Sequence, residues 1–197
     1  MKKSIIISLV LLNSFITFGQ ELKEINLLKA DSTWGKEIIK VPFWFAPEID
    51  YQGYEDIRFA KGWEDVNSSG FWTLVFAWDI NLKTKPTTKF FEDNIKLYLD
   101  GLMKVVNDIE TLIIPKTVAN FRIDKTDSEK VTFKGTIETY DAFTTKKTIA
   151  LNVIIESFYC KKSDKYVPFF RISPRNFDHQ IWEELNRIYL NDDICNN

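Results

Sequence analysis

The sequence predicts an α+β fold, in which a curved antiparallel sheet of six or seven strands carries two helices packed on one face. Two observations support this class. Most of the chain consists of segments in which apolar and polar residues alternate, as in β-strands, and only two segments have helical spacing. The turns between the later strand segments are short and polar, which favours antiparallel neighbours.

The first 19 residues have the pattern of a signal peptide. Lys2 and Lys3 precede a mostly apolar stretch of 14 residues, and Thr17 and Gly19 place small side chains before a cut ahead of Gln20. As a helix this stretch would rise about 21 Å, short of a hydrocarbon core of roughly 30 Å. We therefore expect an exported protein, periplasmic or secreted, with no transmembrane segment after signal removal.

The remaining residues, 20–197, are expected to form a single α+β domain, because no linker rich in glycine, serine or proline divides them. Signal removal takes two lysines from the 26 basic residues and leaves 24 against 28 acidic ones, a net charge of −4. Basic residues are not concentrated anywhere along the chain, so nucleic acid is not an expected partner.

Three strands are expected in the first half of the domain. Residues 37–46 are rich in β-branched and aromatic side chains, and Pro42 removes a ladder donor, which predicts a sheet edge or a bulge. Residues 56–60 form a short second strand. In 71–81 every even-numbered residue from Trp72 to Ile80 is apolar, so this face, with Trp72 and Trp78, belongs in the core.

A helix is expected from about residue 88 to 107 or 109, opened by a threonine cap. Its apolar residues recur at spacings of three or four and form one stripe that should pack on the sheet: Phe91, Ile95, Tyr98, Leu102, Val105 and Ile109. Gly101 costs up to about 1 kcal/mol relative to alanine inside a helix. We therefore expect Gly101 to lie in close contact with another segment of backbone.

The second half predicts four strands and a closing helix. The strands cover 117–123, 129–140, 146–160 and 165–173; the third is apolar on both faces near its middle, which is typical of a central strand. The fourth contains Pro168, which favours a second sheet edge. The closing helix should begin near residues 173–176 and carry Phe177, Ile181, Leu185, Ile188 and Tyr189.

Cys160 and Cys195 are the only cysteines. After export they would be in a compartment where disulfides persist, and a bridge would tie down the C-terminal tail and stabilise the fold. The alternative is that Cys160 packs as a small apolar strand residue while Cys195 is a free thiol.

Motifs for common catalytic and cofactor chemistry are absent from the sequence. It contains no glycine-rich phosphate loop, no Gly-x-Ser-x-Gly, no His-Glu-x-x-His and no Cys-x-x-Cys. One histidine, His179, and two distant cysteines do not make a usual zinc ligand set. We therefore predict no catalytic residues, no metal site and no cofactor.

The candidate site is an aromatic and acidic segment, residues 46–65. Five of the six tryptophans lie between residues 34 and 78, among several carboxylates. Aromatic faces for stacking beside fixed hydrogen-bond acceptors suit a sugar or a peptide. The candidate ligand-binding residues are Trp34, Glu48, Asp50, Tyr51, Tyr54, Glu55 and Trp63.

The resulting hypothesis is a non-catalytic, exported domain that binds a glycan, a peptide or an envelope protein through segment 46–65. One alternative is a cell-envelope hydrolase with a carboxylate pair, such as Asp50 with Glu55 or Glu55 with Glu64. Another is a structural subunit of an envelope assembly, which predicts an exposed apolar patch or a bare sheet edge at the Pro42 or Pro168 strand.

Calcium is a further alternative ligand of the same segment. Glu48, Asp50 and a carboxylate at 55 or 56 would supply oxygen ligands, but Phe59 stands where an EF-hand loop places its bidentate glutamate.

Overall fold

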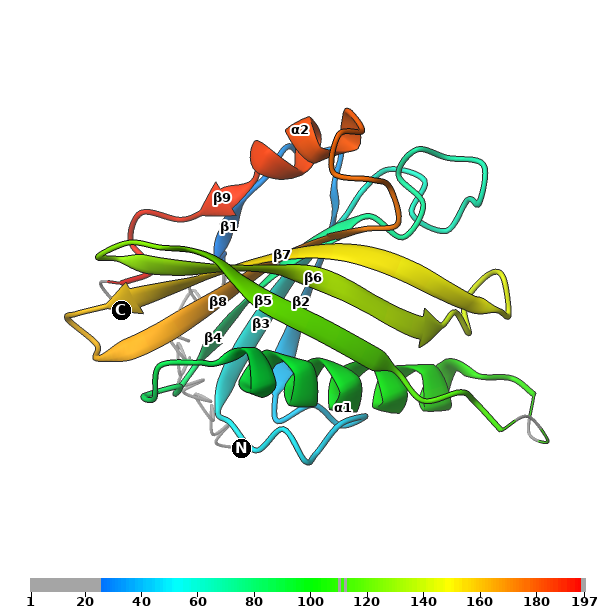
Figure 1. The fold of residues 1–197 in the computed structure, drawn as a ribbon, viewed down its shortest axis with the longest axis horizontal. Coiled ribbons are helices and arrows are strands. Elements are labelled where there is room, and N and C mark those ends of the chain that lie inside the picture. The colour runs from blue at the N-terminus through cyan, green and yellow to red at the C-terminus, as the bar shows by residue number, and fades with distance from the viewer. Residues whose placement is uncertain (1–25, 110, 112, 196–197) are drawn as a thin grey trace, which may run out of the picture.

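The computed structural model describes residues 26–109, 111 and 113–195, so the expected signal peptide lies outside the described residues. A seven-stranded antiparallel sheet, in the order β2-β3-β4-β8-β7-β6-β5, forms the centre of the fold (Figure 1). Its strands are β2 (Gly35–Val41), β3 (Gly53–Phe59), β4 (Leu74–Ile80), β5 (Val118–Thr126), β6 (Lys130–Tyr140), β7 (Thr148–Cys160) and β8 (Lys165–Ser173).

Two helices and a small second sheet complete the fold. They are α1 (Thr88–Val106), α2 (Ile181–Asn186) and a pair of short strands, β1 (Leu28–Lys29) and β9 (Tyr189–Leu190). The predicted α+β class with an antiparallel sheet of seven strands and two helices is confirmed. Each predicted strand of the large sheet is present, and β8 has the predicted bounds.

The expectation that both helices pack on one face is wrong: α1 and α2 cover opposite faces of the sheet (Figure 1). β4 shows why. Its even-numbered residues, including Phe76, pack with α1, whereas Val75 and Ala77 pack with α2. A strand that is apolar on both faces needs cover on both faces.

The expectation of a sheet edge at Pro168 is also wrong, because β8 lies between β4 and β7. Pairing of β8 with β4 ends at Phe169 and Ala77, so Pro168, the residue that precedes Phe169, lies just outside this ladder. The missing N–H of Pro168 is therefore not needed in that ladder. β2, which ends just before Pro42, does lie at an edge of the sheet.

The first helix has nearly the predicted bounds, but its predicted apolar stripe is partly wrong. Val105 and Ile109 are exposed, whereas Leu99 and Met103 are buried.

The predicted cap and the predicted glycine contact of this helix are both present. Thr87 Oγ1 accepts the N–H of Phe90 at 3.2 Å as the N-terminal cap, and the helix ends at Val106. Gly101 faces the loop between β2 and β3: a Cβ atom there would lie 2.1 Å from the carbonyl oxygen of Phe45. The predicted close approach to another backbone is confirmed.

The predicted closing helix is much shorter than expected. Only Ile181–Asn186 is helical, and Tyr189 belongs to β9. The buried Arg171 side chain gives the reason, because its guanidinium donates to the carbonyl oxygens of Leu185 at 3.1 Å and Ile188 at 3.2 Å. These bonds satisfy carbonyl groups that a longer helix would use itself.

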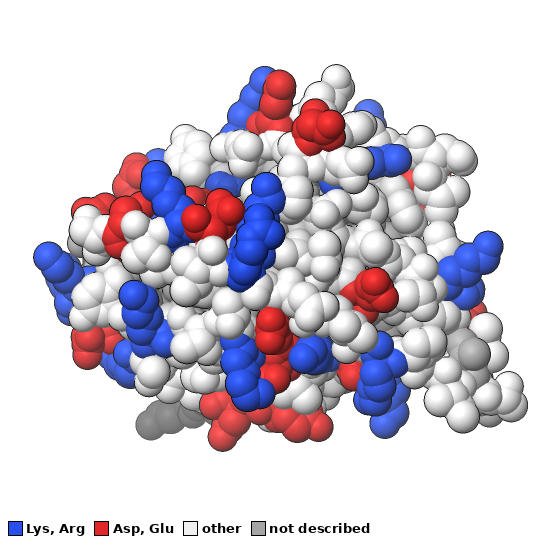
Figure 2. Space-filling model, viewed as in Figure 1, with Lys and Arg blue, Asp and Glu red and all other residues white. Residues whose placement is uncertain are grey.

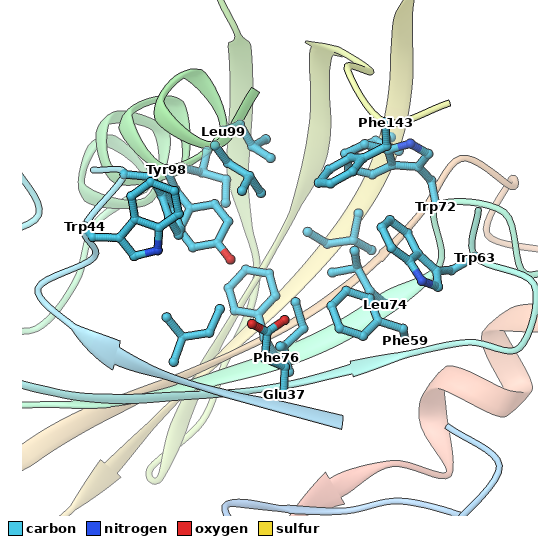
Figure 3. Close-up of a pocket in the computed structure, with 17 residues that line it drawn as sticks. Glu37, Trp44, Phe59, Trp63, Trp72, Leu74, Phe76, Tyr98, Leu99 and Phe143 are labelled. Atoms are coloured by element: carbon cyan, nitrogen blue, oxygen red, sulfur yellow. The ribbon is translucent and has the colours of Figure 1, made fainter. Parts of the chain in front are cut away.

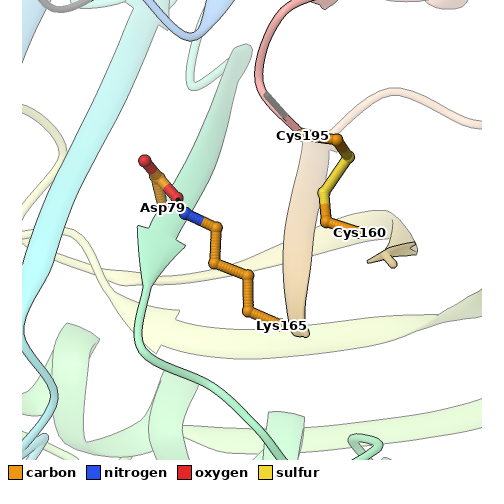
Figure 4. Close-up of a disulfide and its surroundings, with 4 residues drawn as sticks. All are labelled: Asp79, Cys160, Lys165 and Cys195. Atoms are coloured by element: carbon orange, nitrogen blue, oxygen red, sulfur yellow. Dashed lines mark ion pairs between the residues drawn. A yellow bond between two sulfur atoms is a disulfide. The ribbon is translucent and has the colours of Figure 1, made fainter. Parts of the chain in front are cut away.

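A disulfide joins Cys160, at the end of β7, to Cys195 in the C-terminal segment, with Cα atoms 4.9 Å apart (Figure 4). At the same end of the sheet, Lys165 Nζ lies 2.6 Å from Asp79 Oδ1 and links β8 to β4 beyond their last paired residues. The disulfide anchors the C-terminal segment to the end of β7, and the ion pair holds β8 and β4 together past the end of their ladder.

Charged side chains on the face drawn in Figure 2 are of both signs and are interspersed over the described residues. None of the helices in the described part of the chain is long and apolar enough to cross a membrane.

Candidate ligand-binding site

An apolar cavity of about 230 Å³ lies between α1 and the sheet (Figure 3). The sheet supplies Ile57, Leu74, Phe76, Leu151 and Ile172, and α1 supplies Ile95, Tyr98, Leu99 and Leu102. The cavity is larger than an engineered cavity of roughly 150 Å³ that binds benzene, and smaller than the pockets of roughly 300 Å³ and more that hold drug-sized ligands. Its size suits a ligand with one or two rings.

Aromatic side chains from three separate segments gather at one end of the cavity (Figure 3). The Trp63 ring lies 4.9 Å from Phe59, 5.3 Å from Phe143 and 6.4 Å from Trp72, measured between ring centroids. These spacings fall in the range of favourable aromatic pairs. We call Phe59, Trp63, Trp72 and Phe143 the aromatic cluster.

The loop between β3 and β4 positions Trp63 and Trp72. The N–H of Trp72 donates to the carbonyl oxygen of Trp63 at 2.9 Å, and the ends of the loop are joined by the bond from Ala60 N–H to Thr73 O at 3.0 Å. Trp72 has a φ of 46°, a left-handed conformation that is rare for a bulky residue. Such backbone strain, of order 1–3 kcal/mol, is concentrated at functional sites.

The turn between β6 and β7 positions Phe143. The buried carboxylate of Asp141 accepts the N–H groups of Phe143, Thr144 and Thr145 at 2.7 to 3.1 Å. Burial alone would raise the pKa of Asp141, but the hydrogen bonds, led by those from Thr145, outweigh it and hold the pKa below 3.8. The ionised carboxylate therefore organises the turn that carries Phe143.

Exposed Trp44 and buried Phe45 mark the other end of the cavity. Trp44 is 75% exposed, and its ring stands edge-on to Phe45 at 5.7 Å. A large aromatic ring left mostly in water beside an apolar cavity is available to a ligand.

Glu55 is completely buried behind the cavity, between the sheet and α1. Its Oε2 accepts Trp78 Nε1–H at 2.6 Å, and its Oε1 is hydrogen-bonded to the Tyr98 hydroxyl at 2.8 Å. Burial is the main cause that raises the pKa of Glu55 to about 8, and the nearby Glu37 adds to it. At pH 7 Glu55 is therefore mostly protonated and neutral. Burial and Glu55 also raise the pKa of Tyr98.

Glu37 is the acidic residue that lines the cavity. It lies on β2, opposite Ile57 of β3, on the face that also carries Ile39. Figure 3 shows its carboxylate directed toward the space beside Phe76 and Tyr98.

The structure does not bring the seven predicted ligand-binding residues together. Trp63 lines the cavity, and Glu55 is buried behind it. Tyr54 is 40% exposed on β3 and alternates with Glu55, so it points to the other face. Trp34 packs on that other face, beside Ile188.

Glu48, Asp50 and Tyr51 lie in the loop between β2 and β3, at the opposite end of β3 from Trp63. The two carboxylates are exposed, and Tyr51 stands edge-on to Phe90 of α1 at 6.1 Å. Segment 46–65 is therefore two loops and a buried strand, and not one surface.

The carboxylates invoked for the calcium and hydrolase alternatives do not lie together at one accessible site. Glu55 and Asp56 are both fully buried, whereas Asp50 and Glu64 are exposed in loops at opposite ends of β3. Within the described residues, no group of three or more His, Cys, Asp or Glu side chains is arranged to hold a metal ion.

Sequence reasoning missed most of the cavity-lining residues. The clearest available signal was Glu37, a glutamate on the strand face that otherwise carries Ile39 and Val41. A second signal was Phe143, an aromatic residue in a turn that also contains Asp141, Thr144 and Thr145. Trp72, which the strand pattern assigns to the core, is buried and also lines the cavity.

Comparison of the chain with protein-family models, with curated proteins and with solved structures finds no match.

Proposed function

We propose that this protein binds a small, mostly apolar ligand in the cavity beneath α1 and does not transform it. The observation that carries the proposal is the cavity itself: about 230 Å³ lined by apolar and aromatic side chains, with one acidic residue. Well-packed cores have few voids larger than a water molecule, so a space of this size is unusual unless something fills it.

The burial of Glu55, which belongs to both carboxylate pairs considered for a hydrolase, favours binding over hydrolysis. A general acid must come within hydrogen-bond reach of the reacting bond. Glu55, the carboxyl group whose raised pKa would suit that role, is fully buried and does not line the cavity. Trp78 and Tyr98 occupy its two oxygen atoms.

The lining also changes the class of ligand that we expect. A glycan or a peptide needs several hydrogen-bond partners, because its polar groups lose water on entry. The cavity offers few, so an apolar compound, including an apolar component of the cell envelope, suits it better than a sugar.

Thermal unfolding of residues 20–197 with added ligands tests this proposal. We expect neutral one-ring compounds such as 2-phenylethanol to raise the melting temperature by roughly 3–5 °C at ten times their dissociation constant. Oligosaccharides and short polar peptides should leave it unchanged. The reverse pattern would refute the proposal.

Two variants locate the site. Leu102→Phe should fill part of the cavity and weaken binding of 2-phenylethanol, and Trp63→Ala should weaken it by opening one end. Trp34→Ala is the matched control, since Trp34 packs on the other face of the sheet. Equal loss of affinity in both tryptophan variants would place the ligand elsewhere.

We also propose that the protein acts outside the cytoplasm, in the periplasm or after secretion. The signal-peptide pattern of residues 1–19 supports this, and so does a disulfide, which persists in oxidising compartments. N-terminal sequencing of protein recovered from the envelope or the medium should begin at Gln20. A full-length chain retained in the cytoplasm would refute export.

A structural role through the bare edge of the sheet has less support. β2 is an edge strand, but it carries Lys36 and Lys40, and lysines on an edge oppose pairing with a further strand.

A further inference from the structure

Glu37 is the only acidic or basic residue among the described residues that line the cavity. The other lining side chains are aliphatic or aromatic, and no lysine, arginine or histidine is among those described there. Glu37 is itself exposed to solvent, so its negative charge lies on the part of the cavity wall that is open to water. A bound ion of positive sign would find a counter-ion in the wall, and one of negative sign would not.

The position of Glu37 makes its charge effective inside the cavity. Glu37 is opposite Ile57, and Ile39 is opposite Glu55, so the two glutamates are diagonal neighbours on the face that α1 covers. Their separation is short enough that Glu37 contributes to the raised pKa of Glu55. A negative charge from Glu37 thus acts on groups beneath α1.

The aromatic lining adds to this preference. The faces of Trp, Tyr and Phe rings carry partial negative charge and attract cations within about 6 Å of the ring centre. The cavity has aromatic rings at both ends, the aromatic cluster at one and Trp44 at the other. A cation with an apolar body would use both kinds of contact: its charge near Glu37 and its body against the rings.

An anionic amphiphile, such as a fatty acid, fits less well. Its carboxylate would lie near Glu37 with no basic side chain among the described lining residues, and burial of an unpaired charge is costly.

We propose that the ligand of this cavity is a small organic cation, an amine with an apolar body of one or two rings, held by Glu37 and the aromatic lining. This inference rests on the proposed function, because it names the class of ligand that the same cavity takes.

Three probes with one ring and different charges test it: phenethylamine, 2-phenylethanol and 3-phenylpropanoate. Isothermal titration calorimetry at low salt should rank their affinities in that order. We expect phenethylamine to bind about fivefold more tightly than 2-phenylethanol, the size of effect that a partly exposed ion pair produces. This preference should decrease as salt is added.

Glu37→Gln should remove the preference for the amine and leave the affinity for 2-phenylethanol unchanged. Glu138→Gln is the control for net charge: Glu138 is exposed on β6 and alternates with the buried Ile137, so it faces away from α1. It should keep the wild-type preference.

The outcomes separate the two proposals. Binding of 2-phenylethanol with no preference for the amine would overturn the proposal of a cationic ligand, and so would a preference that survives Glu37→Gln. In both cases the proposal of an apolar-ligand site would stand. Binding of 3-phenylpropanoate above the other two would also overturn the cation. If none of the three probes binds, both proposals fail.

Discussion

Glu55 and Asp56 are consecutive residues of β3 and both are completely buried, yet their carboxyl groups lie on opposite faces of the sheet. Glu55 contacts Trp78 and Tyr98 beneath α1. Asp56 pairs with the Arg58 guanidinium and accepts the N–H groups of Leu27 at 2.8 Å and Leu28 at 3.2 Å. One carboxyl group thus lies behind the cavity, and the other anchors the N-terminal segment.

The neutral state of Glu55 predicts a pH dependence of stability. Below its ordinary pKa of 4.5 the group is protonated in both the folded and the unfolded chain. Between 4.5 and about 8 the unfolded chain releases the proton while the folded chain keeps it. The free energy of unfolding should therefore fall by about 1.4 kcal/mol per pH unit from this group, and level off above its folded pKa.

Urea unfolding of wild type and Glu55→Gln between pH 5 and pH 9 measures this contribution. Glutamine keeps an acceptor for Trp78 and a partner for Tyr98 but does not titrate. The difference in unfolding free energy between the two proteins should change in favour of the variant as pH rises to about 8 and should level off above that pH. Parallel curves would show that Glu55 does not titrate with a raised pKa.

The pair of Asp56 and Arg58 predicts a strongly non-additive double-mutant cycle. Arg58→Met leaves the Asp56 carboxylate buried without its guanidinium, which should cost about 3–5 kcal/mol. The double variant Asp56→Asn/Arg58→Met should lose much less than the sum of the single changes, because asparagine still accepts the two N–H groups and carries no charge. Additive losses in urea unfolding would contradict a coupled pair.

The disulfide predicts a redox-dependent stability. Cys160 and Cys195 are 35 positions apart, and closing a loop of this length contributes about 4 kcal/mol in the chain-entropy model. Reduction should lower the free energy of unfolding by about that amount. The Cys160→Ser/Cys195→Ser variant should be equally destabilised and unaffected by reductant, and a wild type that does not respond to reductant would argue against the bridge.

Replacing Gly101 with alanine should destabilise the protein, although alanine has the higher helix propensity. Alanine in place of glycine usually stabilises a helix interior by about 1 kcal/mol. At this position the new Cβ would lie 2.1 Å from the Phe45 carbonyl oxygen, so the loop that carries Trp44 must move. We expect Gly101→Ala to lower the melting temperature, and Leu97→Ala, on the exposed side of α1, to change it little. A stabilised Gly101→Ala would show that the loop yields easily.

Much of the fold was predictable because its signals are local. The even-numbered residues of β4 share a face whatever the chain around them does, and the spacing from Phe91 to Tyr98 places them on one stripe of a helix. The close contact at Gly101 was equally predictable, because glycine is unfavourable inside a helix unless a neighbouring segment leaves no room for a side chain. The length of the closing helix was not predictable from local signals. The helix ends where Arg171 of β8 donates hydrogen bonds to the carbonyl oxygens of Leu185 and Ile188.

The candidate site was far less predictable. Trp63 was identified from composition, but Tyr54 and Trp34 lie on the other face of the sheet. Composition shows that aromatic and acidic residues are near one another along the chain, whereas a strand sends neighbours such as Tyr54 and Glu55 to opposite faces.

The sequence by itself determined the α+β class, the strands, the first helix and its contact at Gly101. These follow from residue periodicity and backbone chemistry, which act over a few residues. Only the tertiary structure decided which face each helix covers, how Trp63 and Phe143 meet at one end of a cavity, and which glutamate is buried and which lines that cavity. Those outcomes depend on long-range packing and on the loss of water around Glu55, which no local pattern records.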